Sequence, residues 1–289
     1  MTAPSSPGEE TTSSEPTIRR SRWQRFSPSM GWPAFWSEIL IVVLGVAIAL
    51  AASEAVEAWN WRNKVRDAEV RIKDDIAWAF LWSAEKSIGQ PCVDAQLAAM
   101  ASAVIESGET LPPMPVVTVL DLQRVVYMPN RPWRFPVWGA LLADGTASHF
   151  DTQRQALFGR IGDGLVLSRE SQSDERRLGG RLLLMRDAIP LDPGVRTSLL
   201  ADINNLRSIA AYDALNARQR MRLIADAGLA PPEAMVERFM NASGEQPVGV
   251  DFSGIAHFCT LHDLPFADWR EYRKLPATNI LYPNAGVAK

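Results

Sequence analysis

The chain has 289 residues, of which 47% are hydrophobic, and a formal net charge of −3 at pH 7. This length and composition supply enough apolar material for one sizeable folded domain or two small ones. The nearly balanced charge gives no global basic field, and no cluster of lysines and arginines interleaves with exposed aromatic residues in the way that nucleic-acid binding needs, so nucleic acid is not an expected partner.

Residues 1–31 form the first segment, and their composition predicts a disordered tail. Ser, Thr, Pro, Gly and Glu dominate the stretch before Ile18, so it buries too little apolar surface to offset the entropy lost on ordering. Four arginines follow between residues 19 and 25, immediately before the first apolar run. Basic flanks of this kind help to orient membrane segments.

An apolar stretch within residues 32–60 predicts a transmembrane anchor in contact with the lipid bilayer. Its charge-free part, Ile39–Ala52, is shorter than the about 20 residues that a spanning helix needs. The flanking tryptophans extend it, because a helix from Trp36 to Trp59 is about 35 Å long and the hydrocarbon layer is about 30 Å thick. Tryptophan favours the water–lipid boundary. The predicted membrane-interface residues are Trp32, Trp36, Trp59 and Trp61.

Two alternatives to a permanent anchor remain open. Ala49-Leu50-Ala51 follows a basic flank and an apolar core, which is also the pattern of a cleavable signal peptide. Against cleavage, the helical pattern continues through this site as far as Trp59. A buried helix of a soluble protein is the other alternative, and it leaves the flanking tryptophans unexplained.

Charge counting does not decide the orientation of the anchor. Residues 19–38 and residues 53–72 each carry four lysines or arginines, so the positive-inside rule gives a tie. Because a basic segment precedes the first apolar run, we expect a single-pass signal anchor in the bacterial inner (cytoplasmic) membrane. The N-terminus is then expected in the cytoplasm and the C-terminal domain in the periplasm.

Gly45 and Ala49 stand four residues apart, on one face of the predicted anchor. Small residues at this spacing let two helices approach each other closely in lipid. The spacing therefore predicts association of the anchor with a second copy of the chain or with another membrane protein.

Beyond the anchor, residues 61–250 are predicted to form a helical soluble domain, followed by a C-terminal extension, 251–289, that is irregular or a short helix. The fold class is therefore all-α. Apolar residues recur every three or four positions from Trp61 to Ser87, so we expect the anchor to continue as an amphipathic stalk. Pro91–Glu106 is expected to be a separate helix. Two further helices are predicted to begin after the N-cap residues Asp151 and Asp192.

Shorter patterns complete the expected domain. Residues 137–142 predict a short helix, and the strand signal is confined to β-branched residues at 116–120 and 124–127. Gly162-Asp163-Gly164 is expected to break the helix that contains it. Mixed charges at helical spacing in residues 169–177 predict a solvent-exposed helix face.

Three motifs of the chain occur together: E-I-L-I-V-V-L-G-V-A-I-A-L at Glu38–Leu50, the tryptophans Trp59 and Trp61 at the exit, and Trp138–Gly145 further along. In these motifs the chain resembles a family of uncharacterised bacterial single-pass membrane proteins of unknown function. The resemblance covers the anchor and, more loosely, the part that follows. It implies a membrane location and a mostly helical soluble part, and it carries no activity.

The residues with metal or redox chemistry are few. Cys92 and Cys259 could form one disulfide or remain two buried thiols, with unpaired thiols the simpler expectation. His257, Cys259 and His262 are weak candidate ligands for zinc or copper, although their spacing matches no zinc motif. We predict no catalytic residue and no cofactor.

Three classes of function follow from these patterns. The leading expectation is a non-enzymatic interaction or scaffold protein of the bacterial envelope. The first alternative is an extracytoplasmic sensory or ligand-binding domain. The second is a metal-dependent enzyme that uses the region of His257, Cys259 and His262.

Overall fold

The computed structural model of the chain describes residues 32–119, 122–240 and 254–275. The fold is all-α, as predicted, with short strands between the helices. Packing divides the chain into two units, Met1–Trp59 and Asn60–Lys289. The predicted tail at residues 1–31 lies outside the described residues, so the first unit is represented by the beginning of the first helix, α1, Trp32–Glu106.

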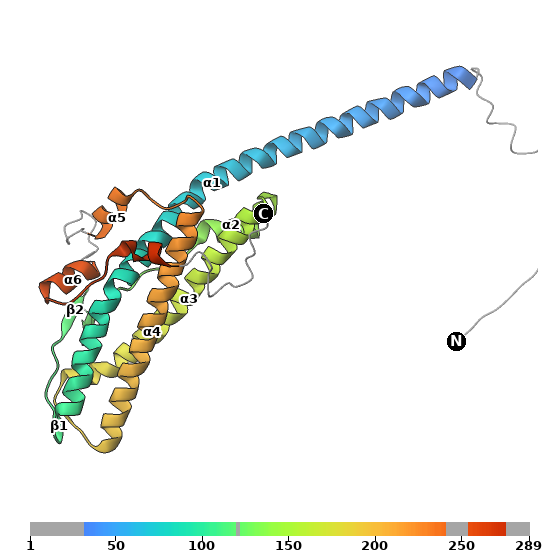
Figure 1. Cartoon of the computed structure of the whole chain (residues 1–289). Coiled ribbons are helices and arrows are strands. Elements are labelled where there is room, and N and C mark those ends of the chain that lie inside the picture. Colours follow the sequence, from blue (N-terminus) through green and yellow to red (C-terminus); the bar gives the residue numbers. More distant parts are fainter. Residues whose placement is uncertain (1–31, 120–121, 241–253, 276–289) are drawn as a thin grey trace, which may run out of the picture. The chain divides into compact units, whose positions relative to one another are not determined.

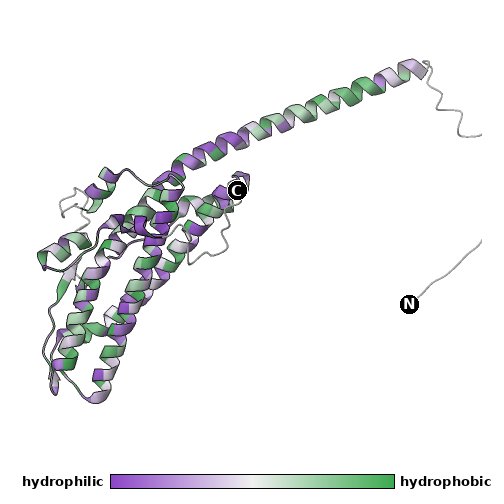
Figure 2. Cartoon of the chain, viewed as in Figure 1, coloured by the Kyte–Doolittle hydropathy of each residue, from purple (hydrophilic) through white to green (hydrophobic). Residues whose placement is uncertain are grey.

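In the first unit, α1 is an apolar helix whose described side chains are all exposed. Ile41 is 69% exposed and Leu50 is 61% exposed. Figure 2 shows the hydrophobic colour along this part of the helix. A core helix of a soluble protein would be mostly buried, whereas none of the most apolar window here is buried. The prediction of one helix long and apolar enough to cross a membrane is confirmed among the described residues.

Helix α1 spans Trp32–Glu106 and contains Pro91 in its interior. The prediction of a separate helix from Pro91 to Glu106 is therefore wrong. A proline in mid-helix removes one hydrogen bond, but it stands here between Gln90 and the fully buried Cys92, where packing supports the helix. The segment expected to be a stalk is also a core element, since Ala68 and Ile72 are both buried.

Two long helices pack beside the C-terminal part of α1. Helix α3, Thr152–Leu182, and helix α4, Pro193–Asp226, lie side by side with it in Figure 1. Both begin as predicted, because Asp151 accepts a hydrogen bond from the backbone N–H of Arg154 and Asp192 accepts one from Val195. The predicted break at Gly162-Asp163-Gly164 is wrong, since α3 runs through it.

Short elements connect these helices. Two pairs of short strands are antiparallel. The first pair is β1, Thr110–Leu111, with β4, Ile189–Pro190. The second is a hairpin of β2, Val117–Val119, and β3, Leu122–Arg124, with Val117 opposite Arg124. The strand predicted at 124–127 therefore lies a few residues earlier. The remaining connecting elements are α2, Pro136–Ala143, close to the predicted short helix, and the 3-10 helices η2, Thr146–His149, and η3, Leu183–Arg186.

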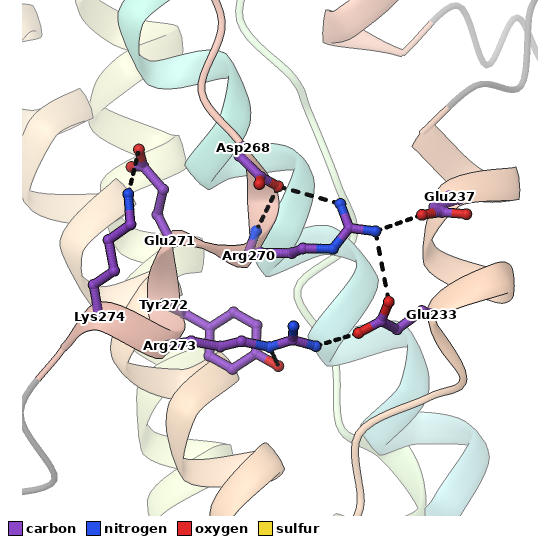
Figure 3. A network of polar contacts seen from close by, with 8 residues as sticks. All are labelled: Glu233, Glu237, Asp268, Arg270, Glu271, Tyr272, Arg273 and Lys274. Carbon is purple, nitrogen blue, oxygen red and sulfur yellow. Dashed lines mark hydrogen bonds and ion pairs between the residues drawn. The ribbon is translucent and has the colours of Figure 1, made fainter.

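The C-terminal elements belong to the second unit. They are α5, Glu233–Met240, α6, Ile255–Leu261, and the 3-10 helix η4, Trp269–Lys274. Ile255 is fully buried and contacts α1 so closely that a Cβ on Gly89 would lie 2.6 Å from it. Side chains from α5 and η4 are joined by the ion pairs of Figure 3, with Arg270 2.5 Å from Glu237. The described part of the expected C-terminal extension is thus an integral part of the domain.

Candidate functional site

A layer of buried polar side chains crosses the three long helices in the middle of the second unit. Two hydrophobic clusters adjoin it, the first containing Ile76 and Ile161, and the second containing Leu97 and Leu178. The layer separates these clusters along α3 and α4, whereas on α1 the first cluster continues past the layer to Cys92. Its buried members are Ser83, Glu85, Lys86 and Ser87 on α1, Ser168, Gln172 and Glu175 on α3, and Asp213, Asn216, Gln219 and Arg220 on α4.

Lys86 is the central cation of this polar layer. Its Nζ donates to both carboxylate oxygens of Glu175, at 2.5 and 2.7 Å, and lies 3.3 Å from Oδ2 of Asp213. Burial alone would lower the pKa of Lys86, but the charges of Glu175 and Asp213 raise that pKa above its ordinary value. Lys86 is therefore protonated at neutral pH and joins all three long helices.

A second cation completes the charge balance on α4. Nη2 of Arg220 donates to Oγ of Ser168 at 2.7 Å, and the Ser168 hydroxyl donates to Oδ1 of Asp213 at 2.7 Å. The guanidinium of Arg220 also lies 5.1 Å from the ring centre of Trp133. Buried charges are tolerated when they are paired and hydrogen-bonded, which is the arrangement here.

The segment between β3 and α2 is fixed to the polar layer by Arg131 and Trp133. Arg131 Nε and Nη2 each donate to one oxygen of Glu85 at 2.6 Å, as a two-pronged ion pair. Oε1 of Gln172 accepts from the backbone N–H of Arg131 at 2.8 Å and from Nε1 of Trp133 at 3.0 Å. These bonds identify the amide oxygen of Gln172 and leave its Nε2 group as a donor.

A cavity of about 260 Å³ opens beside the polar layer, between residues 122–130 and one face of α3. Buried Gln172 and Glu175 form part of its wall. The other lining residues include Arg124 and Arg176. The cavity therefore joins a fixed polar wall to two guanidinium groups, which is an arrangement that can bind a small polar molecule.

Most of the residues with a predicted role in the anchor are exposed. Trp32, Trp36 and Trp59 are all more than half exposed, and a Cβ on Gly45 would meet no atom within 4 Å. Trp61 differs, because its ring stacks on His149 with the ring centres 3.8 Å apart and with Lys64 Nζ 4.4 Å above it. Trp61 thus packs within the second unit. Helix association through Gly45 and Ala49 stays a prediction, and so does a membrane-interface position for the other three tryptophans.

The two cysteines are joined, which corrects the expectation of unpaired thiols. Cys92 on α1 and Cys259 on α6 form a disulfide with their Cα atoms 6.0 Å apart, and both residues are fully buried. Sequence spacing could not show this pairing, because it depends on α6 packing against α1. The disulfide ties the C-terminal elements to the long helix.

The same disulfide removes the thiolate from the weak metal candidates. Cys259 is bonded to Cys92, and His257 and His262 are exposed, with the ring of His262 4.4 Å from that of Phe258. In the described ranges, no three His, Cys, Asp or Glu side chains are grouped so that they would hold a metal ion. These three residues are therefore close in sequence without forming a ligand set.

The polar layer was missed by the sequence analysis, although a signal for it exists. Residues 169–177 were expected to face solvent, yet Gln172 and Glu175 are buried. Both residues continue the three- and four-residue spacing of the buried Leu165, Ser168 and Leu178. Polar or charged residues on the apolar stripe of a helix are the signal that would have identified them.

These features define an all-α protein with one helix long and apolar enough to cross a membrane. Comparison of the chain with protein-family models, with curated proteins and with solved structures finds no match of any of the three kinds.

Proposed function

We propose that this chain is a single-pass membrane protein of the bacterial envelope, and that it holds a disulfide-bonded helical domain at the membrane surface as an interaction or scaffold protein. The observation that carries the proposal is the course of helix α1. This single helix begins with an apolar segment of which no part is buried, and it ends as a core element of the disulfide-bonded domain. An exposed apolar helix of this length needs a lipid or protein surrounding.

The disulfide supports a location of the domain outside the cytoplasm. Disulfides form and persist in oxidising compartments and are rare where thiols are kept reduced. The bond between Cys92 and Cys259 therefore favours the N-in, C-out orientation that charge counting left undecided. In a bacterium with an inner membrane this compartment is the periplasm.

Topology reporters fused after Lys289 test the orientation. We expect an alkaline phosphatase fusion to be active and a cytoplasm-active fluorescent fusion to stay dark. In parallel, denatured wild-type protein should bind a thiol-reactive polyethylene glycol at Cys92 and Cys259 only after reduction. Fluorescence of the second fusion, together with labelling of both cysteines without reductant, would contradict the proposal.

Association through the anchor is the proposed means of interaction. Gly45 and Ala49 lie on one face of α1, where a second helix could approach closely. We expect Gly45→Leu to reduce self-association of the full chain in lipid vesicles, measured by energy transfer between labelled copies. Val43→Leu, on the opposite face, is the matched control. Equal energy transfer in both variants would remove this face from the proposal.

The cavity beside the polar layer favours a second candidate function, the sensory or ligand-binding domain. Its volume of about 260 Å³ is slightly below the range of about 300–1,000 Å³ that small-molecule sites occupy, and Gln172 in its wall is held by one buried and one partly buried hydrogen bond. A preformed wall lowers the entropy cost of binding a ligand.

A further inference from the structure

We propose that the cavity between residues 122–130 and α3 binds a small organic anion, with one carboxylate or phosphate group and a short apolar body. This inference gives the ligand class for the second candidate function above, and it depends on the cavity alone. It does not depend on the compartment of the domain or on association of the anchor.

Two positive charges at the cavity have no counter-charge within the described residues. Arg124, at the end of β3, and Arg176, on α3, both line the cavity, and neither guanidinium group makes an ion pair or hydrogen bond with a described residue. Some other arginines on the long helices are paired, as Arg207 is with Asp94 at 2.5 Å. A guanidinium presents five N–H donors in a planar fork that matches carboxylate and phosphate oxygens.

The acidic residue in the wall does not cancel these charges. Glu175 is 4% exposed, and both its oxygens accept hydrogen bonds from Lys86, at 2.5 and 2.7 Å. Its negative charge is thus compensated inside the polar layer. Gln172 adds a hydrogen-bond donor to the cavity wall. Its Oε1 already accepts hydrogen bonds from Arg131 and Trp133, so its Nε2 group is the part of the amide that can donate to a ligand. Arg124, Arg176 and Gln172 thus offer donors and positive charge to a ligand.

Apolar and small residues form the remainder of the lining and leave room for the body of the ligand. Val126, Met128 and Leu183 supply apolar contacts. Gly179 and Gly180 are consecutive glycines within α3, and a Cβ on either would meet no atom within 4 Å. Glycine within a helix is unfavourable by about 1 kcal/mol relative to alanine, so packing alone does not account for this pair. The volume of about 260 Å³ suits a ligand with one ring or a short chain.

Calorimetric titration of the purified full-length chain in detergent micelles tests the proposal. The probes are phenyl phosphate and benzoate, with benzylammonium as the cationic counterpart of the same size. We expect at least one anion to bind and benzylammonium not to bind. Arg124→Gln and Arg176→Gln should each raise the Kd roughly tenfold or more, since each removes charge-assisted hydrogen bonds. Arg169→Gln, two turns before Arg176 on α3 and outside the cavity, should leave the Kd unchanged.

A second variant tests the cavity without removing charge. Gly179→Leu should raise the helix propensity of α3 and place a side chain where the ligand would lie, so binding should be lost while the domain remains folded. Three results would overturn the proposal. These are no binding of either anion at millimolar concentration, equal binding of benzylammonium, or an unchanged Kd in the Arg124→Gln/Arg176→Gln double variant. Because purified protein is used, failure of the topology experiments would leave this measurement unaffected.

Discussion

Replacing Lys86 by methionine is expected to destabilise the domain strongly, because two buried carboxylates lose their shared cation. Lys86 Nζ lies 2.5 Å from Glu175 and 3.3 Å from Asp213, and the three side chains are at most 5% exposed. At about 3 Å and an effective dielectric constant of about 20, one such charge pair is worth about 5 kcal/mol before desolvation is counted. Breaking a buried pair costs about 3–5 kcal/mol, and we expect a loss of that size in the free energy of unfolding.

Chemical denaturation of the full-length chain in detergent, with the disulfide intact, measures this loss through tryptophan fluorescence. Arg177→Met is the matched control, because its ion pair with Asp174 is 3.1 Å long with both side chains more than half exposed. Such surface pairs contribute about 0–1 kcal/mol. The double variant Lys86→Met/Glu175→Met should be less destabilised than Lys86→Met, since it also removes one stranded carboxylate. The reasoning is refuted if Lys86→Met costs no more than Arg177→Met.

Three further predictions concern the disulfide, one ion pair and one helix cap. Cys92→Ala/Cys259→Ala should lower the free energy of unfolding by about 2–5 kcal/mol, since the bond closes a loop with a sequence separation of 167, and adding reductant should then change nothing. Arg273 holds the pKa of Glu233 below its ordinary value of 4.5. Their pairing therefore stabilises the fold above about pH 4.5, and this stabilisation is lost as the pH falls through the lower pKa of the folded state. The difference in Tm between wild type and Glu233→Gln should vanish in strong acid. Asp192→Ala removes the 2.9 Å cap of α4 and should cost about 1 kcal/mol in thermal unfolding.

Local signals in the sequence were sufficient for the starts of the long helices α3 and α4. Asp151 and Asp192 were predicted as N-caps, and both accept the expected backbone hydrogen bond. Apolar spacing also identified the buried face of α1, where Ile72 and Ile76 are almost fully buried. Caps and apolar stripes are properties of a few neighbouring residues, so a sequence carries them directly.

Features that depend on distant parts of the chain were not predicted. The continuation of α1 through Pro91 depends on the packing of both flanking segments, which outweighs the local cost of proline. Pairing of Cys92 with Cys259 requires the position of α6 on α1. Lys86 and Glu175 were assigned to no site, because charged residues are rarely fully buried and each becomes acceptable inside only beside the other.

The position of Cys259 near the end of the chain also sets an order of events during synthesis. At about 5–20 residues per second, the separation of 167 residues means that Cys92 waits roughly 8–33 seconds for its partner to be made. During that time α6 cannot be fastened to α1. These 289 residues contain no third cysteine, so the waiting thiol has no other partner in this stretch. Wrong pairing of Cys92 with cysteines of other molecules should become more frequent as copies of the growing chain are crowded together.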